Sequence, residues 1–473
     1  MLKAVSNTIF KLILLSIFLI PLTISDKRLF LNLGEFRNET YIYPLLLGFI
    51  CFGFYLLLKG VINLPLKSIF FQILILLSLW FLATFIISFP SIATNDFKGI
   101  NGIARFLRQY FSAIFSIILT PVVLYNIFNN YETKTIFKKI EKVIEASLIV
   151  VFCFAMIEFA SIVLNSNAAH GIIVWINRNF PLVFISEDIY LKRVSSISHE
   201  PPFLGMYLIF VTPWILKGLV TNSKKWKYTL FLIMILILAL ISKSRAAQLF
   251  CLIEILLFTV ILVLSKKSFL QKFILTTMLF LLITPFLFLW KGDAIFKDIG
   301  DRIDSFKIVK NLEDNNSNKT RLGTIIAGLE TFIEHPIAGV GYGQQGYYLI
   351  DKYPVWAVEG NWEIERYLNE DEPNYPPGFN FYVRLLSETG IVGFLLFSLF
   401  IFYLIFFCFK RYSFTKDIHY LLFFTIFVGF AINWMQIDTP RIYGFWITLA
   451  ILWVYLKEEK KHNERINNSN TSL

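Results

Sequence analysis

Apolar residues fill long uninterrupted stretches of this chain, and polar residues gather in the segments between them. A helix needs about 20 mostly apolar residues, roughly 17 to 25, to cross a lipid bilayer. Stretches of this kind are found at 8–24, 41–59, 67–89, 104–127, 143–164, 202–220, 226–242, 246–265, 269–290, 388–409, 418–435 and 441–457. The pattern therefore predicts an all-α polytopic integral membrane protein with about twelve transmembrane helices.

Lysine is concentrated in the short segments that alternate between these stretches. Lysine-rich loops lie near 130–142, 221–227, 266–268 and 410–416, and the tail after residue 457 is also lysine-rich. Cytoplasmic loops of membrane proteins carry an excess of Lys and Arg. We therefore expect both termini to be cytoplasmic. The first stretch has a charged lead but no small-residue cleavage site, so we expect a retained anchor.

Two segments on the predicted outer side break the short-loop pattern. Residues 172–185 are moderately apolar but contain Arg178 and Pro181, which favours an interfacial or re-entrant element. Residues 291–387 form a large extracytoplasmic loop, with an amphipathic helix expected at 321–334. The predicted organisation is 1–164 for the N-terminal helices, 165–201 for an outer loop, 202–290 for the central helices, 291–387 for the large loop, 388–457 for the C-terminal helices and 458–473 for a cytoplasmic tail.

Composition excludes a water-soluble protein, because 56% of the 473 residues are hydrophobic and only 16% are charged. The net charge of +11 does not indicate a nucleic-acid partner, since the basic residues lie in short loops between apolar spans. The four cysteines all lie within apolar spans and lack metal-ligand or redox spacing. We expect neither a metal nor a cofactor.

Arginine is distributed differently from lysine. Of the fourteen arginines only Arg411 and Arg465 fall on the predicted inner side. A guanidinium binds phosphate in a bidentate way that lysine cannot reproduce, so arginines on the outer side suggest a phosphorylated ligand. The candidates are Arg193, Arg245 and Arg321, with Arg384 in reserve. Interfacial snorkelling would also explain Arg193, and a simple polar turn would explain Arg245.

Further polar residues are placed where outer loops meet helix ends. His199 and Glu200 precede a span directly, where charges are costly unless they are paired or solvated. A glycine-rich bend with His335 and Tyr342 would bring backbone amides to an anion or a sugar, or would be purely structural. If the segment after residue 379 is helical, one helical face carries Asn380, Arg384, Ser387 and Glu388.

These residues occur in an order that resembles the O-antigen polymerase and O-antigen ligase superfamily. The pieces are Arg-x-x-x-x-x-His-Glu-Pro at 193–201, Ser-x-Ser-Arg at 242–245, Arg-Leu-Gly at 321–323, His-Pro-x-x-Gly-x-Gly-x-Gly at 335–343 and Asn-x-x-x-x-Leu-x-Ser-Glu-x-Gly-x-x-Gly at 380–393. The resemblance implies a metal-independent membrane glycosyltransferase of the bacterial inner membrane. Its donor would be an undecaprenyl-diphosphate-linked oligosaccharide used on the outer face, and Arg193, Arg245 and Arg321 would stabilise the diphosphate leaving group.

One position departs from the family pattern. A histidine often precedes the Asn of the late motif, but this chain has Phe379 there. His335, His199, Glu200 and Glu388 remain as candidates for the base that takes the acceptor proton, and we favour His335 because imidazole titrates near neutrality. His199, Glu200, Tyr342, Asn380 and Arg384 are the expected substrate-binding residues.

The resemblance favours a polymerase that joins lipid-linked repeat units. The alternatives are a ligase that transfers glycan to lipid A core and, in another class, a flippase for lipid-linked glycans, although no internal repeat of the transporter type is evident. Expected partners are membrane lipids and a chain-length regulator and flippase of the same pathway. The aromatic and acidic residues of 347–375 would offer a sugar-binding surface, or would anchor the loop at the membrane.

Overall fold

The computed structural model describes residues 1–23, 36, 39–180, 183–265, 316–372 and 375–470. The span predicted at 269–290 lies outside the described residues, as do Arg28, Arg37 and Arg302. Apart from one short hairpin, the named elements of the described part are helical, as the hydropathy pattern predicts.

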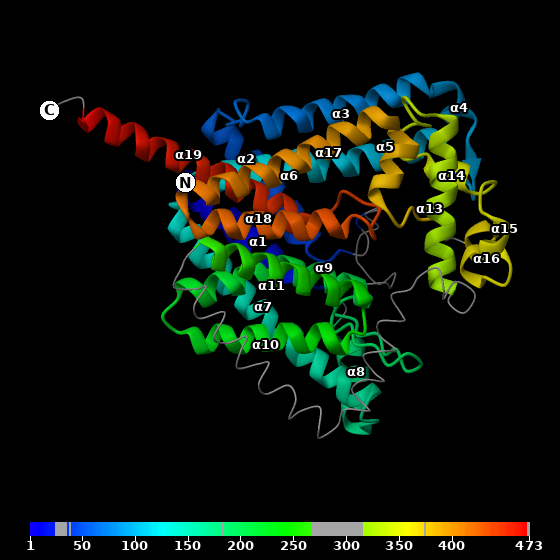
Figure 1. The fold of residues 1–473 in the computed structure, drawn as a ribbon, viewed down its shortest axis with the longest axis horizontal. Helices are drawn as coiled ribbons and strands as arrows, with labels where there is room; N and C mark the ends of the chain where they lie inside the picture. The colour runs from blue at the N-terminus through cyan, green and yellow to red at the C-terminus, as the bar shows by residue number, and fades with distance from the viewer. Residues whose placement is uncertain (24–35, 37–38, 181–182, 266–315, 373–374, 471–473) are drawn as a thin grey trace.

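Long apolar helices lie alongside one another and form a bundle (Figure 1). They are α1 (Leu2–Leu19), α2 (Ile42–Lys59), α3 (Ile69–Ile87), α7 (Thr133–Ile162), α9 (Pro201–Thr221), α10 (Lys225–Ile241), α11 (Arg245–Ser265), α17 (Phe381–Thr415), α18 (Ile418–Asn433) and α19 (Tyr443–Asn470). A further helix consists of α5 (Gly102–Ile114), the π-helical segment η2 (Phe115–Leu119) and α6 (Thr120–Phe128). Among the described residues, 8 helices are long and apolar enough to cross a membrane. The chain is therefore a polytopic helical membrane protein, and the count of twelve stays a prediction.

Two helices extend beyond the predicted spans. The lysine-rich segment near 130–142 is mostly helical and not a loop, because α7 begins at Thr133 and buries Ile136 and Ile140 on one face. Helix α19 continues past the span predicted at 441–457, as far as Asn470. Both segments are rich in Lys and Glu, which are good helix formers outside the bilayer as well as inside it. Hydropathy marks where apolar residues end, and a helix can continue past that point.

Shorter elements gather at one end of the bundle, which we call the cap end. They are α4 (Phe89–Thr94), the antiparallel pair β1 (Asp96–Phe97) and β2 (Ile100–Asn101), α8 (Asn167–Asn179), α13 (Asn316–Glu334), α14 (Gln345–Leu349), α15 (Val355–Val358) and α16 (Trp362–Leu368). Helix α13 lies across the end of the bundle, and α15 and α16 lie outside it (Figure 1). Here α8 overlaps the interfacial element expected at 172–185, and α13 contains the amphipathic helix expected at 321–334.

A small second core holds α15 and α16 against α13. Its buried members are Ala327, Leu349, Tyr353, Ala357 and Ile364. The packing is tight, because a Cβ added at Gly323 would lie 2.5 Å from the Cβ of Ala357. These contacts fix α16 in one register on α13.

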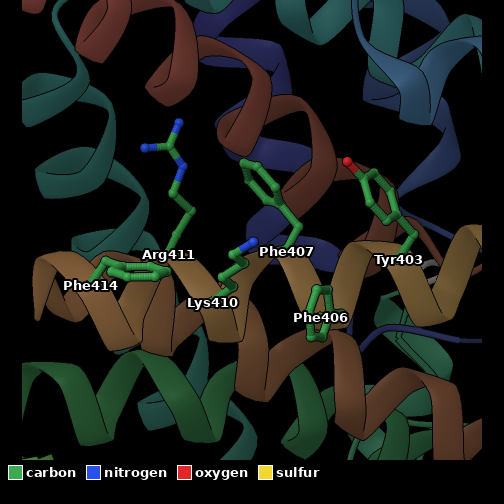
Figure 2. Close-up of a pocket in the computed structure, with 6 residues that line it drawn as sticks. All are labelled: Tyr403, Phe406, Phe407, Lys410, Arg411 and Phe414. Atoms are coloured by element: carbon green, nitrogen blue, oxygen red, sulfur yellow. The ribbon is translucent and has the colours of Figure 1, made fainter.

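A pocket at the opposite end of the bundle has a different character. Figure 2 shows the side chains that line it, all from the last part of α17: Tyr403, Phe406, Phe407, Lys410, Arg411 and Phe414. Aromatic rings beside basic groups are typical of a membrane–water interface. None of the residues predicted to carry chemistry lines this pocket.

Candidate active site

Arg245 and Arg321 come from separate motifs, and the structure brings them together at the cap end. Arg245 is the first residue of α11, and its Nη2 donates a hydrogen bond to Oδ1 of Asn318 at 2.9 Å. Asn318 and Arg321 both lie in the first part of α13. Arg245 is near enough to lower the pKa of Arg321. Two guanidinium groups are therefore held close together by two different helices.

Burial is the main influence on Arg321. It lowers the pKa of the guanidinium, and the Glu363 carboxylate opposes this most strongly among the neighbouring charges. Arg245 lowers the pKa of Arg321 further, whereas Glu200 raises it. A guanidinium nevertheless stays charged in proteins. Arg321 is therefore a partly buried cation near carboxylates from α16 and from the start of α9.

Phe379 lies beside this cation. The Cζ of Arg321 is 5.5 Å from the centroid of the Phe379 ring, within the range of a cation–π contact. Phe379 has a φ of 51°, a left-handed conformation that is unusual for a bulky side chain and costs on the order of 1–3 kcal/mol. The position at which the family pattern has histidine is thus next to Arg321.

Glu363 enters the site from the cap. Its Oε1 accepts a hydrogen bond from the Tyr367 hydroxyl at 3.1 Å. Burial, and then the Glu363 carboxylate, raise the pKa of Tyr367, so this hydroxyl keeps its proton and acts as a donor. Sequence reasoning noted Glu363 only as one member of an acidic run. Nothing in the sequence distinguishes it from its acidic neighbours.

Glu200 and His199 also lie in this region. Glu200 occupies the N-cap position of α9 and influences both Arg321 and Tyr367. The Nε2 of His199 is 3.6 Å from Oε1 of Glu200. The backbone N–H of His199 donates to the Thr23 hydroxyl at 2.8 Å, which ties this segment to the end of α1. Glu200 therefore lies near Arg321, and its role in binding substrate stays a prediction.

Arg193 has a partner in its own loop. Its Nε is 3.0 Å from Oδ2 of Asp188, and these two residues form an isolated antiparallel bridge. The loop packs on the turn between α10 and α11, because Val194 donates to the Ile241 carbonyl at 3.2 Å. The buried carboxylate of Glu158 accepts the Ser196 N–H at 2.6 Å and anchors the loop to α7. The role of Arg193 in phosphate binding stays a prediction.

His335 lies far from Arg321. It follows the last residue of α13, whereas Arg321 is near the start of this 19-residue helix. At 1.5 Å per residue, the two positions are about 20 Å apart. The exposed His335 instead lies beside Tyr348, with 5.9 Å between ring centroids. The prediction that His335 acts as base together with the arginines is not met, because one rigid helix separates them.

The glycine-rich bend is structural. Val340 donates to the Ser387 carbonyl and Gly341 to the Glu388 carbonyl, both at 2.9 Å. At Gly339, where φ is +67°, a Cβ would lie 2.4 Å from the carbonyl carbon of Glu388. Glycine is needed here because two backbones touch. These amides bond the protein itself, which supports the structural alternative for this segment.

Arg384 and Glu388 form a buried pair in the first part of α17. Their side chains are 3.0 Å apart, and Arg384 also donates to the Asp438 carbonyl at 2.8 Å and to Gln109 at 3.0 Å. Glu388 in turn accepts the N–H of Gln345 at 3.2 Å. The predicted common face of Arg384 and Glu388 is present, but it joins α17 to its neighbours.

Two further predicted substrate-binding residues belong to the same junction. Asn380 is the N-cap of α17, where its side chain accepts the N–H groups of Tyr382 and Val383. Tyr342 is buried and stacks on Phe81 with 4.1 Å between ring centroids. Both residues therefore have structural roles that the sequence alone does not indicate.

Part of the chain is similar to a known family. The sequence model of the O-antigen ligase family matches residues 230–398. This region is similar to the O-antigen ligase family. The match includes Arg245, Arg321, Glu363 and Phe379, and it supports a function of the O-antigen ligase and polymerase type. The apolar helices make the chain a membrane protein. No curated protein matches the chain.

Proposed function

We propose that this protein is a polysaccharide polymerase of the bacterial inner membrane. It joins undecaprenyl-diphosphate-linked repeat units on the outer face, without a nucleotide sugar or a metal. The observation that carries the proposal is the pair Arg245 and Arg321 within the family-matched region: Arg245 bonds Asn318 near the start of α13, and Arg321 of the same helix contacts the ring of Phe379. Paired guanidinium groups at a helix end suit a lipid diphosphate better than they suit a neutral ligand.

The chemistry follows from the leaving group. A hydroxyl of the acceptor sugar attacks the anomeric carbon of the donor, and the bond from that carbon to the diphosphate oxygen breaks. The bonding electrons leave with the lipid diphosphate, which gains negative charge in the transition state. Preorganised cations at that point stabilise the charge without reorganisation cost. We assign this role to Arg245 and Arg321.

The position of Arg245 also suits a lipid-linked donor. It begins α11, a helix long and apolar enough to span the membrane. A group at the end of such a helix lies near the headgroup level of the bilayer. The polyprenyl tail of the donor can therefore stay in the lipid while its diphosphate reaches the arginines. A flippase and a chain-length regulator of the same pathway are the partners that this reaction needs.

A ligase is the second candidate, because the matching family is described as O-antigen ligase. The two enzymes share the donor and the leaving group and differ in the acceptor. A polymerase extends another lipid-linked repeat unit, whereas a ligase transfers the glycan to lipid A core.

Reconstitution distinguishes the candidates. Purified protein in liposomes should elongate lipid-linked repeat units with no nucleotide present. Arg245→Ala and Arg321→Ala should each reduce the rate by roughly 100-fold or more, as is typical when one charge-stabilising donor is removed. Arg366→Ala is the matched control, since this exposed arginine of the cap pairs with Glu372 at 3.3 Å.

Each other outcome identifies a different function. Transfer to lipid A core without elongation would establish a ligase. Movement of the lipid-linked unit across the bilayer without a new glycosidic bond would establish a flippase. Near-normal elongation by either arginine variant would overturn the diphosphate assignment.

A further inference from the structure

We propose that Glu363 of α16 is the base that takes the proton from the acceptor hydroxyl. The cap would then supply the group that this chain lacks at Phe379. This inference rests on the proposed function, because it assumes that the arginines bind the diphosphate of the donor.

The position of Glu363 relative to Arg321 supports this role. Asn361 at the start of α16 donates to Thr320, the neighbour of Arg321 on α13, at 2.9 Å, and Glu363 follows Asn361 by two residues. Among the charged groups around Arg321, the Glu363 carboxylate also raises its pKa most strongly. Arg321 also contacts the ring of Phe379, so Glu363 and position 379 flank the same guanidinium. A diphosphate bound to that guanidinium would lie next to both. A base must come within hydrogen-bonding reach of the attacking hydroxyl, about 2.6–3.2 Å.

The contacts that hold Glu363 in place also support this role. Asn361 is the N-cap of α16, and its Nδ2 donates to the Thr320 hydroxyl on α13 at 2.9 Å. The buried Ile364 packs in the second core beside Ala357. On the other side of the carboxylate, the Tyr367 hydroxyl holds Oε1 at 3.1 Å. Glu363 is thus fixed by its own helix and by α13, whereas most of its acidic neighbours are exposed.

The other candidate bases fit less well. His335 is about 20 Å from Arg321 along α13. Glu388 is almost fully buried and bonded to Arg384, so it cannot meet a sugar hydroxyl. Glu200 remains the one serious rival, but its side chain is 57% exposed and its nearest ionic partner is His199 at 3.6 Å. A solvated carboxylate is a weaker choice for a base than one held in place.

The charged groups at the site balance one another before the substrate binds. The charged groups around Arg321 are Glu363 from α16, Arg245 from α11 and Glu200 from the start of α9, and Glu363 also lies near Tyr353 and Tyr367. Without substrate, two guanidinium groups face two carboxylates. An arriving diphosphate takes hydrogen bonds from the guanidinium groups.

The proposed step is balanced. The acceptor oxygen forms a bond with the anomeric carbon, and its proton passes to the Glu363 carboxylate. The bond from carbon to diphosphate breaks, and its electron pair leaves with the diphosphate, whose charge Arg245 and Arg321 hold. Glu363 releases the proton to solvent before the next cycle. Tyr367 is a positioning residue, since it acts only through Glu363.

The test separates binding from turnover in full-length protein reconstituted in liposomes. Glu363→Gln should bind undecaprenyl diphosphate as tightly as the native protein or more tightly, because a negative charge next to the anion is removed. Its elongation rate should fall by roughly 100-fold or more. Glu365→Gln is the matched control, since Glu365 is an exposed carboxylate on the same helix. In Glu363→Ala, added formate should restore part of the rate, which a merely structural role would not allow.

The outcomes distinguish the two proposals. If the native protein binds undecaprenyl diphosphate and elongates glycan, but Glu363→Gln turns over normally, the base assignment fails alone. Loss of turnover in Glu200→Gln with normal Glu363→Gln would transfer the role to Glu200. If the native protein does not bind undecaprenyl diphosphate, the proposed function itself fails.

Discussion

The arginines at the cap end differ in their hydrogen-bond and charge partners. Arg384 is surrounded by protein acceptors: the Glu388 carboxylate, the Asp438 carbonyl and the Gln109 side chain. Arg321 instead contacts an aromatic ring and lies near carboxylates of α16 and α9. A cation whose donors are already used cannot bind a phosphate strongly. Of these two arginines, Arg384 therefore has a structural role, and Arg321 is the candidate for catalysis.

The structural role of Arg384 can be tested by removing one partner and then both. Arg384→Met leaves the almost fully buried Glu388 without its cation and should destabilise the protein by about 3–5 kcal/mol. Arg384→Met combined with Glu388→Leu removes both charges and should recover most of that loss. Thermal unfolding in detergent measures both variants. Equal stability of the single and the double variant would show that the pair contributes little.

One buried acid within an apolar span is not evident from the hydropathy pattern. Glu254 lies in the middle of α11 and is fully buried, and neither carboxylate oxygen has a hydrogen-bond partner among the described residues. Gly429 of α18 makes room for it, because a Cβ there would lie 2.1 Å from Oε1 of Glu254. A single acid hardly changes the mean hydropathy of a span. The hydropathy pattern therefore does not reveal this acid.

Helix α17 illustrates what is decided at the scale of an element. Its regular geometry breaks at Gly390, which has a φ of 64° and a ψ of −169°. The bend before α14 packs into this break, and Ile391 donates to the Pro336 carbonyl at 2.8 Å. The hydropathy pattern predicts a helix in this region, but it does not predict that a loop some fifty residues earlier bonds to the helix. Pairing of this kind depends on close backbone approach, which leaves only glycines as its trace.

Gly390→Ala should disrupt this junction. The positive φ alone costs on the order of 1–3 kcal/mol for a residue with a side chain. The added Cβ would also lie 2.1 Å from the Ile337 carbonyl oxygen, so the bend must move. We expect a lower melting temperature in detergent. Gly53→Ala is the control, since no atom lies within 4 Å of a Cβ there and alanine favours a helix. An unchanged melting temperature for Gly390→Ala would contradict the junction.

At the scale of the whole molecule, the order of motifs in the sequence is a poor guide to their distances. The spans are predictable because each is a local apolar pattern, and the grouping of Glu200, Arg245 and Arg321 agrees with their predicted position on one face. His335 was grouped with them only by motif order. Helix α13 keeps His335 at the other end of the cap. The same helix holds α16, whose Glu363 belongs to no motif but lies near Arg321. Distances between motifs in the cap depend on the length and direction of its helices. The order of motifs in the sequence does not give these directions.

Orientation in the membrane is the property on which the proposed chemistry depends most. The positive-inside rule predicts that the cap faces outward and that the end of α19 faces the cytoplasm. In spheroplasts, Glu365→Cys on α16 should react with a membrane-impermeant maleimide. Lys460→Cys on α19 should react only after permeabilisation, although its side chain is 71% exposed. The native cysteines, which lie within apolar helices, should stay unlabelled and serve as the background. Labelling with the opposite sidedness would place the arginines in the cytoplasm, where transfer onto an external glycan is impossible.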